Sequence, residues 1–321
     1  MGRVDAVGPV RPAVEADAEP AVHRERRAAE NRDTVAPYAD PGPAALARSG
    51  LGLSLAYRDA QVQVVSDVRL SEREARALAA RVERAYAFDA AIHGWAKDDD
   101  LKARLTVAVL GQGAFQALSG DSTGAVGGFT TGPSLFVVPE EVARLRRADD
   151  DVTIAHELGH VQDYRQAGRR LEQVPMYLQE GKAYLLGDLE PMARGEGSAS
   201  ARGVVATWER MSARDAQWVV QRFRTARDEA LSGRNGYVGE VGGALFVEFL
   251  RTRFHGGHAD VLRRLGTVVA DVGAGQSYGA AFARQFGGSP EAAERAFVAW
   301  VKATEDDPAR RLDGSVLESV A

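Results

Sequence analysis

The chain has 321 residues, of which 45% are hydrophobic, and this is enough apolar material for one large domain or two modest ones. Its formal net charge is -5, from 40 basic and 45 acidic residues, and no run of Lys and Arg forms a basic stripe, so we expect no nucleic-acid partner. The absence of Cys excludes disulfides and thiolate metal sites, which leaves His and carboxylates as the ligands for any metal.

The first 50 residues have a composition of their own. Six of the chain's 12 prolines lie between Pro9 and Pro43, and charges of both signs alternate with Ala without a sustained apolar period. Such a segment cannot bury enough surface to offset its ordering entropy. We therefore expect residues 1–50 to form a disordered tail, and residues 307–321 to form a flexible C-terminal tail.

Membrane and export signals are not evident in the sequence. No stretch approaches the roughly 20 apolar residues that span a bilayer. The N-terminus lacks the apolar stretch of a secretory signal. The sequence therefore predicts a soluble protein, either cytoplasmic or exported by a non-classical route.

Strands are expected in the first half of the folded region. Alternation and apolar runs predict strands at 60–65, 105–110, 129–131 and 134–138, the last two joined as a hairpin. Between the first two strands, Ser71 and Glu74 form a capping box that predicts a helix to about Ala90. The Gly-rich segment 111–128 is expected to form loops without phosphate-binding character.

Beyond residue 150 the pattern is almost wholly helical. One helix is predicted over 152–167, closed by Gly168, and another over 176–186, closed by Gly187. Further helices are expected at 202–211, 212–231, 237–254, 258–271, 278–285 and 290–304, the last with Ser289 as its cap.

Strands followed by helices predict an α+β fold with a mixed sheet. We expect an α+β lobe at 51–175, which contains the hairpin and a metal-binding helix, and a mostly helical lobe at 176–306.

The residues that carry chemistry lie on the helix predicted over 152–167. His156 and His160 are four residues apart, so they project from one face of that helix and can share one zinc ion. Glu157 lies beside such a metal rather than on it, which suits a general base that holds a metal-activated water. Gly159 permits close approach of another backbone.

A catalytic zinc usually takes a third protein ligand and keeps one position open. Glu180 follows His160 after nineteen intervening residues and lies on the next predicted helix. A short turn that contains Gly168 and Pro175 lets this helix pack back against the first, so Glu180 is the expected third ligand.

The two segments H-E-L-G-H (156–160) and Y-L-Q-E-G-K-A (177–183) together resemble the gluzincin metallopeptidases, in particular the bacterial peptidase-MA-like families. The resemblance implies a zincin-like fold and one zinc ion per chain. It implies His156, His160 and Glu180 as zinc ligands and Glu157 as the base.

The resemblance extends less specifically over residues 134–302. Segments that fill corresponding places in those families are 236–239, 249–254, 286–287 and Trp300. The hairpin 129–138 sits where such enzymes keep the sheet edge above the active-site helix. Tyr237 is the best candidate for an oxyanion donor, because it is expected to open a helix of the second lobe.

The chain also departs from the family's pattern. Many gluzincins carry an acid four residues after the ligand Glu, which orients a zinc His, but this chain has Tyr184 there. Asp188 or a backbone carbonyl can take that role. A metzincin needs Gly and His where Asp163 and Gln166 stand, so that alternative fails.

The remaining candidates for ligands are weaker. Asp163 is expected to have a surface or supporting role rather than to bind metal. His255 and His258 form an alternative pair, although a loop after a helix is an ordinary place for His. His23 falls in the predicted tail, and His93 is expected to be exposed.

The sequence thus predicts a zinc-dependent peptidase that acts on peptide or protein substrates, with endopeptidase action favoured. A non-catalytic zincin-like binding or scaffold module is the alternative from another class, and a zinc-dependent hydrolase of a non-peptide amide is the third. An intact Glu157 favours catalysis, since a structural zinc site needs no base.

Overall fold

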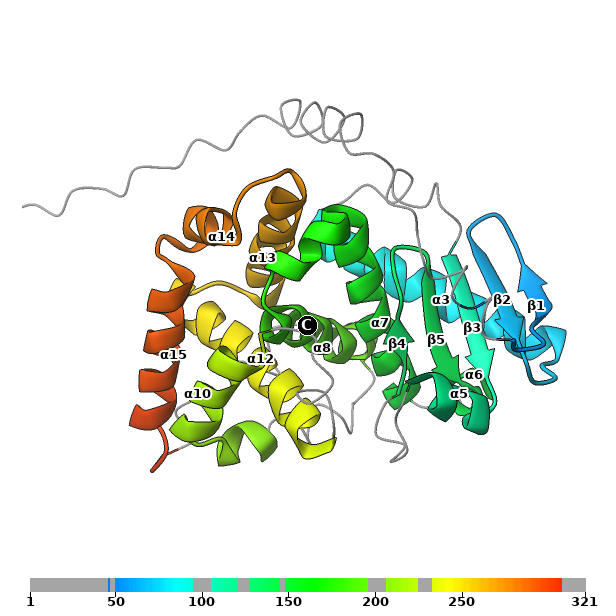
Figure 1. Cartoon of the computed structure of the whole chain (residues 1–321), viewed down its shortest axis with the longest axis horizontal. Coiled ribbons are helices and arrows are strands. Elements are labelled where there is room, and N and C mark those ends of the chain that lie inside the picture. Colours follow the sequence, from blue (N-terminus) through cyan, green and yellow to red (C-terminus); the bar gives the residue numbers. More distant parts are fainter. Residues whose placement is uncertain are drawn as a thin grey trace, which may run out of the picture. The chain divides into compact units, whose positions relative to one another are not determined.

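The computed structural model describes Leu46 and residues 50–94, 105–119, 127–144, 148–195, 206–224 and 233–307 (Figure 1). All of these belong to one compact unit that spans Ala39–Ala321. The tails predicted at 1–50 and 307–321 lie outside the described residues, apart from Leu46, Gly50 and Asp307. No helix among the described residues is long and apolar enough to cross a membrane.

The described strands form one five-stranded sheet in the order β1-β2-β3-β5-β4 (Figure 1). Their bounds are β1 (Ser54–Arg58), β2 (Val62–Ser66), β3 (Leu105–Leu110), β4 (Phe129–Thr130) and β5 (Leu135–Pro139). β2, β3 and β5 are parallel, whereas β1 and β4 run antiparallel at the two edges. The α+β class and the mixed sheet are therefore confirmed, and the 129–138 hairpin is formed by β4 and β5.

Both faces of the sheet are covered, because alternate residues of each strand point to opposite sides. Val107 and Val109 of β3 pack against α3 (Glu72–His93) and α7 (Ala148–Ala167). Ala108 and Leu110 face the other way, toward Phe115 of α5 (Gln112–Ser119). The central strand is therefore buried along its whole length, and α7 is fixed on one face of the sheet.

The second part of the chain is helical, as predicted. Its helices are α8 (Met176–Ala193), α10 (Ala213–Arg222), α12 (Gly233–Phe254), α13 (His258–Gly273), α14 (Tyr278–Phe286) and α15 (Pro290–Ala303). Aromatic residues fill its core, among them Trp208, Phe223, Phe246, Phe282 and Phe297, each at most 1% exposed. α8 packs against both α7 and α12, so it joins the helical part to the sheet-bearing part.

Small residues let these helices approach at backbone distance. A Cβ atom added at Gly243 of α12 would lie 2.0 Å from the Tyr177 carbonyl oxygen of α8, and one at Gly181 of α8 would lie 2.2 Å from the Gly243 carbonyl carbon. On the other side of α8, a Cβ at Gly187 would lie 2.8 Å from the Val152 carbonyl oxygen of α7. Helix α8 is thus wedged between α7 and α12 with no room for side chains at these positions.

Helix ends follow the predicted caps. The Ser71 backbone N–H donates to Glu74 Oε2 at 2.7 Å, and the Glu74 N–H donates to Ser71 Oγ at 3.2 Å, which is the predicted capping box of α3. Ser289 Oγ accepts from the Ala292 N–H at 3.2 Å and caps α15. Gly168 closes α7 with a φ of 53°, as predicted, and a 3₁₀ helix (η1, Gly168–Gln173) follows.

Several predicted elements were wrong in extent or kind. The Gly-rich segment 111–128 contains helix α5, because Phe115 buries its ring beneath the sheet and anchors the turn. α8 continues past Gly187 to Ala193, since that glycine serves close packing against α7 rather than a helix end.

Other elements differ at their ends. Within the described residues α10 stops at Arg222 instead of continuing toward 231, and α12 begins at Gly233 rather than at Tyr237. Strand β1 and the short α6 (Glu140–Arg144) were not predicted.

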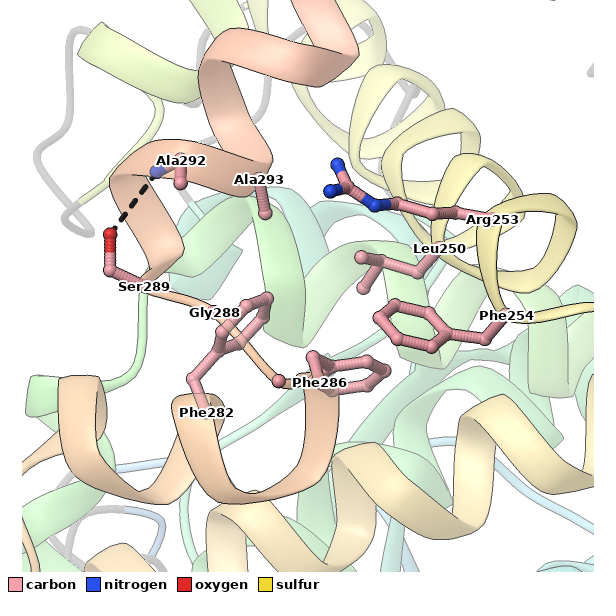
Figure 2. A pocket seen from close by; sticks show the side chains of 10 residues that line it. Leu250, Arg253, Phe254, Phe282, Phe286, Gly288, Ser289, Ala292 and Ala293 are labelled. Atoms are coloured by element: carbon pink, nitrogen blue, oxygen red, sulfur yellow. Dashed lines mark hydrogen bonds between the residues drawn. The ribbon is translucent and has the colours of Figure 1, made fainter. Parts of the chain in front are cut away.

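A small pocket of about 50 Å³ lies between the end of α12 and helices α14 and α15 (Figure 2). The Phe254 and Phe286 rings line it with their centroids 5.3 Å apart. None of the predicted site residues lines this pocket, so we assign it no role in the chemistry below.

Candidate metal centre

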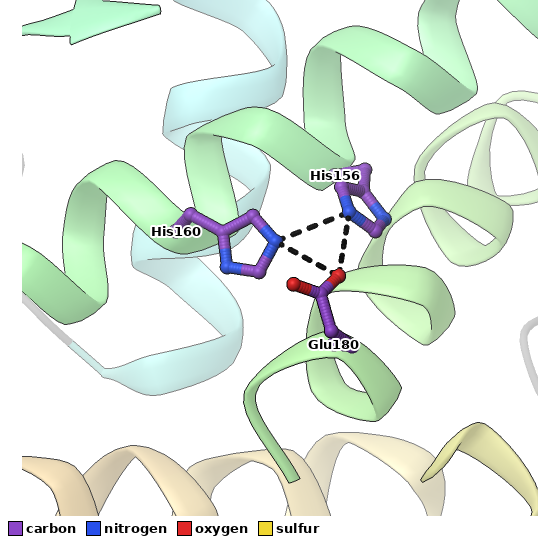
Figure 3. Close-up of side chains that lie close together, drawn as sticks. All are labelled: His156, His160 and Glu180. Carbon is purple, nitrogen blue, oxygen red and sulfur yellow. Dashed lines mark hydrogen bonds and ion pairs between the residues drawn. The ribbon is translucent and has the colours of Figure 1, made fainter. Parts of the chain in front are cut away.

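Two imidazoles and one carboxylate meet where α7 and α8 pack together (Figure 3). His160 Nε2 lies 3.1 Å from His156 Nε2 and 3.2 Å from Glu180 Oε2. His156 Nε2 lies 3.3 Å from the same carboxylate oxygen. The group can hold a metal ion, so the structure brings together all three of the ligands that the sequence predicted.

The local sequence explains this convergence. His156 and His160 lie one turn apart on α7, and η1 reverses the chain so that Glu180 comes up on the first turns of α8. Gly159 lies between the two histidines in sequence, and a Cβ added there would lie 3.2 Å from the Leu186 Cδ1 atom and 3.4 Å from the Ala183 Cα atom of α8. Glycine at this position therefore gives α8 room beside the ligand helix, as expected.

The three side chains are partly buried, with 12–16% of each side chain exposed. Burial would lower the pKa of His160, but the Glu180 carboxylate outweighs it and raises that pKa to about 9. The pKa of His156 is also raised, because its hydrogen bond to Glu180 outweighs burial. Burial would raise the pKa of Glu180, but the two imidazoles hold it well below its usual value. In the metal-free chain, the protonated imidazoles thus attract the Glu180 carboxylate and keep the three side chains together.

Glu157 points to the edge strand of the sheet. Thr130 Oγ1 of β4 donates to Glu157 Oε2 at 2.8 Å, and it also lies 3.0 Å from the Glu157 carbonyl oxygen. Burial raises the pKa of Glu157, and the neighbouring imidazoles and the Thr130 hydroxyl oppose that rise. A carboxylate with a raised pKa, held beside the three-residue group, suits a general base. Sequence reasoning had not singled out Thr130.

A further acid, Glu240 of α12, lies close enough to the group to interact electrostatically with it. Burial raises the pKa of Glu240 to about 7, and the negative charges of Glu180 and Glu157 add to this rise. It is not a member of the ligand group, whose atoms lie within 4.8 Å of one another. The sequence alone gave no signal for Glu240, because its position depends on how α12 crosses α8.

Tyr184 lies one turn after Glu180 on α8. Its ring packs edge-on against the His156 imidazole, with centroids 5.6 Å apart and an interplanar angle of 86°. The residue four positions after Glu180 therefore gives His156 an aromatic contact rather than a carboxylate. Asp188, one turn further along α8, is buried.

Tyr237 lies on the second turn of α12, one turn before Glu240, and 42% of the residue is exposed. Its hydroxyl lies 3.2 Å from Thr207 Oγ1. Its predicted role as an oxyanion donor stays a prediction.

Asp163 is fully buried and forms an ion pair with Lys182, which is 2% exposed. The surface position considered for Asp163 is therefore wrong, and the supporting role is the one that remains. Neither residue belongs to the ligand group.

The other histidines lie apart from the group. His93 was expected to be exposed but is only 6% exposed, because α3 packs its C-terminal end against α13 at Gly266. His258 is buried and its Nε2 lies 3.0 Å from Glu248 Oε2, so it belongs to a separate ion pair. His255 ends α12 with a φ of 48° and is not part of any metal-holding group among the described residues. His23 lies outside the described residues.

The sequence was also compared with protein-family models and with curated proteins, and no match was found in either comparison.

Proposed function

We propose that the chain is a zinc-dependent metallopeptidase of the gluzincin kind, with His156, His160 and Glu180 as ligands. The spacing of the three donor atoms carries the proposal. Two donors about 2.0–2.1 Å from a common tetrahedral centre lie roughly 3.3–3.4 Å apart. The separations of 3.1–3.3 Å in the structure are close to this value.

The donor set suits zinc and argues against Mg²⁺ and Ca²⁺. Two imidazoles and one carboxylate are the protein ligands of several catalytic zinc sites, whereas Mg²⁺ and Ca²⁺ prefer oxygen ligands throughout. The chain has no Cys that would direct the site toward softer metals or a closed structural site. Three ligands leave one position for water or substrate.

Glu157 supplies the base in this proposal. A zinc ion bound by His156, His160 and Glu180 would polarise the scissile carbonyl and lower the pKa of a water molecule bound to it. Glu157 takes a proton from the attacking water and passes it to the leaving amine. The Thr130 hydroxyl holds the carboxylate toward the sheet edge and keeps it from turning away.

The edge strand offers a place for a peptide. β4 is paired only on its β5 side among the described strands, and its Thr130 touches Glu157. An extended peptide can add to such an edge through backbone hydrogen bonds. We expect endopeptidase action, because an edge strand recognises backbone rather than a chain terminus. The contact of Thr130 with Glu157 also favours catalysis over a scaffold role, since a scaffold needs no oriented base.

Metal analysis combined with a peptide-library assay tests the proposal. We expect one zinc per chain in the wild type and in Glu157→Gln, with cleavage by the wild type alone. Glu141→Gln, on the exposed side of α6, is the matched control and should cleave normally. A wild type that binds zinc but cleaves no peptide would rule out the peptidase, and one that binds no zinc would rule out the metal site.

A further inference from the structure

The ion pair between Asp163 and Lys182 joins the two helices that carry the metal ligands. Asp163 follows His160 by three residues on α7, and Lys182 follows Glu180 by two residues on α8. The side chains are 0% and 2% exposed, so water does not screen the pair. Each member is thus buried within one helical turn of a ligand, on opposite sides of the same interface.

Besides the contacts of Glu180 with His156 and His160, the other ion pair across this interface that involves a described residue of α7 is at its far end, where Arg194, directly after α8, donates to Asp151 Oδ2 at 2.7 Å. The close contacts of the interface are Gly159 against Ala183 and Gly187 against Val152, which are small or aliphatic residues in van der Waals contact. Such contacts favour close approach, but they set no direction in the way that a hydrogen-bonded ion pair does. Asp163–Lys182 is the ion pair next to the ligands, and its side chains are less exposed than those of Asp151 and Arg194.

A gain in folding stability does not explain why this ion pair is buried. Burying two charges costs desolvation energy, and well-packed apolar side chains of similar volume often stabilise a protein as well or better. The surroundings make the cost higher, because within the described part of the chain Asp163 Oδ2 has no hydrogen-bond partner and both amide atoms of Gln162 are buried without one. Asp89 of α3 adds a second buried acid that interacts with both Asp163 and Lys182.

We propose that Asp163 and Lys182 are positioning residues, which fix the rotation and slide of α8 against α7 so that Glu180 meets His156 and His160 at metal-binding distance. The inference rests on the metal site of the proposed function and not on peptide hydrolysis. The pair touches neither metal nor substrate and acts through the three ligands.

The double variant Asp163→Leu/Lys182→Met tests this, because it replaces the pair by apolar side chains and removes its negative and its positive charge together. We expect it to fold, with a thermal midpoint near that of the metal-free wild type, but to bind zinc about 10- to 100-fold more weakly, as loss of supporting contacts at metal sites usually does. The visible absorption of bound Co²⁺ should also change, because it reports the arrangement of the ligands. Zinc affinity within twofold of the wild type with an unchanged Co²⁺ spectrum would overturn the proposal.

Two further variants separate positioning from general stability. Arg251→Met removes the cation of a buried ion pair with Glu248, which also contacts His258 of α13 and is not a residue of α7 or α8. It should lower the thermal midpoint and leave zinc affinity unchanged. Asp163→Lys/Lys182→Asp restores an ion pair in reverse and should recover most of the zinc affinity. If Arg251→Met weakened zinc as much as the double variant, the pair would be only a stabilising contact. A wild type without zinc affinity would instead refute the metal site itself.

Discussion

The hydroxyl of Thr130 links Glu157, the proposed base, to the sheet. Thr130→Val keeps the shape of the side chain but removes its hydrogen bond to Glu157. We expect kcat to fall roughly 10- to 100-fold, since a hydrogen bond to a charged group contributes about 1.5–3 kcal/mol. The acidic limb of the pH–rate profile should move to higher pH, because the hydroxyl lowers the pKa of Glu157.

Thr131→Val is the matched control for this change. Its hydroxyl lies 3.5 Å from the Leu135 carbonyl oxygen within the hairpin and does not touch Glu157. Steady-state kinetics at several pH values, with zinc content measured in each variant, provide the comparison. Equal kcat in the two variants would show that Thr130 does not hold the base.

Tyr237 is the other single residue with a testable role. If its hydroxyl donates to the developing oxyanion, Tyr237→Phe should lower kcat by about 10²- to 10³-fold with KM and zinc content little changed. Thr207→Val is informative beside it, because it removes the hydroxyl that lies 3.2 Å from the tyrosine while leaving the phenol in place. Unchanged turnover in Tyr237→Phe with intact zinc would dismiss the role.

Among the contacts between helices, the close crossing of α8 and α12 fixes the position of α8 and therefore of Glu180. A methyl group at Gly243 would lie 2.0 Å from the Tyr177 carbonyl oxygen, which is backbone and cannot swing aside. We expect Gly243→Ala to destabilise the protein by about 1–3 kcal/mol or more, because the two helices must separate. Zinc affinity should fall with it.

Gly279→Ala provides the comparison, since nothing lies within 4 Å of an added Cβ at that helical position. It should be neutral or stabilising by up to about 1 kcal/mol. Urea unfolding of both variants measures the difference. Similar midpoints would mean that the α8–α12 crossing can relax at little cost.

Structural features that depend on neighbouring residues were the ones predicted best from the sequence. The H-E-x-x-H spacing, the Ser71–Glu74 capping box and the Gly168 helix end depend on neighbouring residues, and each was confirmed in place. Glu180 was predictable because only a short reversal separates its helix from α7.

The contacts missed from the sequence join distant segments. Thr130 is hydrogen-bonded to Glu157, which is 27 residues away in the sequence, and Arg81 to Asp151, which is 70 residues away. Glu240 approaches the ligands only because α12 lies against α8. Helix α5 was missed for a related reason. Gly113 within it and the glycines that flank it argue against a helix, and the sheet face that holds Phe115 is formed by strands elsewhere in the chain.

For the whole molecule, the ligand group couples stability to pH and to metal. In the metal-free chain the pKa of His160 is about 9, above its usual value near 6.5. A raised pKa means that this stabilisation is complete below pH 6.5 and is lost as the pH rises to about 9. We therefore expect the metal-free chain to become less stable over that range.

Zinc should reverse this trend, because it binds only after the imidazoles lose their protons. Its affinity should rise with pH and level off near pH 9, and a thousandfold excess over Kd should add about 4 kcal/mol to the free energy of unfolding. Thermal unfolding with zinc or with a chelator, at pH 6.5 and pH 9, measures both effects. His160→Ala should bind zinc weakly and should show a smaller change of stability with pH, because only the raised pKa of His156 remains. A metal-free wild type that is equally stable at both pH values would contradict the expected pKa shift.

The short length of β4, which spans only Phe129–Thr130, also affects how strongly copies of this protein can associate with one another at high concentration. Exposed sheet edges are templates for self-association, and short edge strands are one way in which proteins avoid it. Two residues give a neighbouring copy too few backbone hydrogen bonds to stay attached, and in the proposed function they would align a peptide beside Glu157 only briefly. In the proposed function, the same short edge strand would therefore bind a peptide briefly and also discourage aggregation.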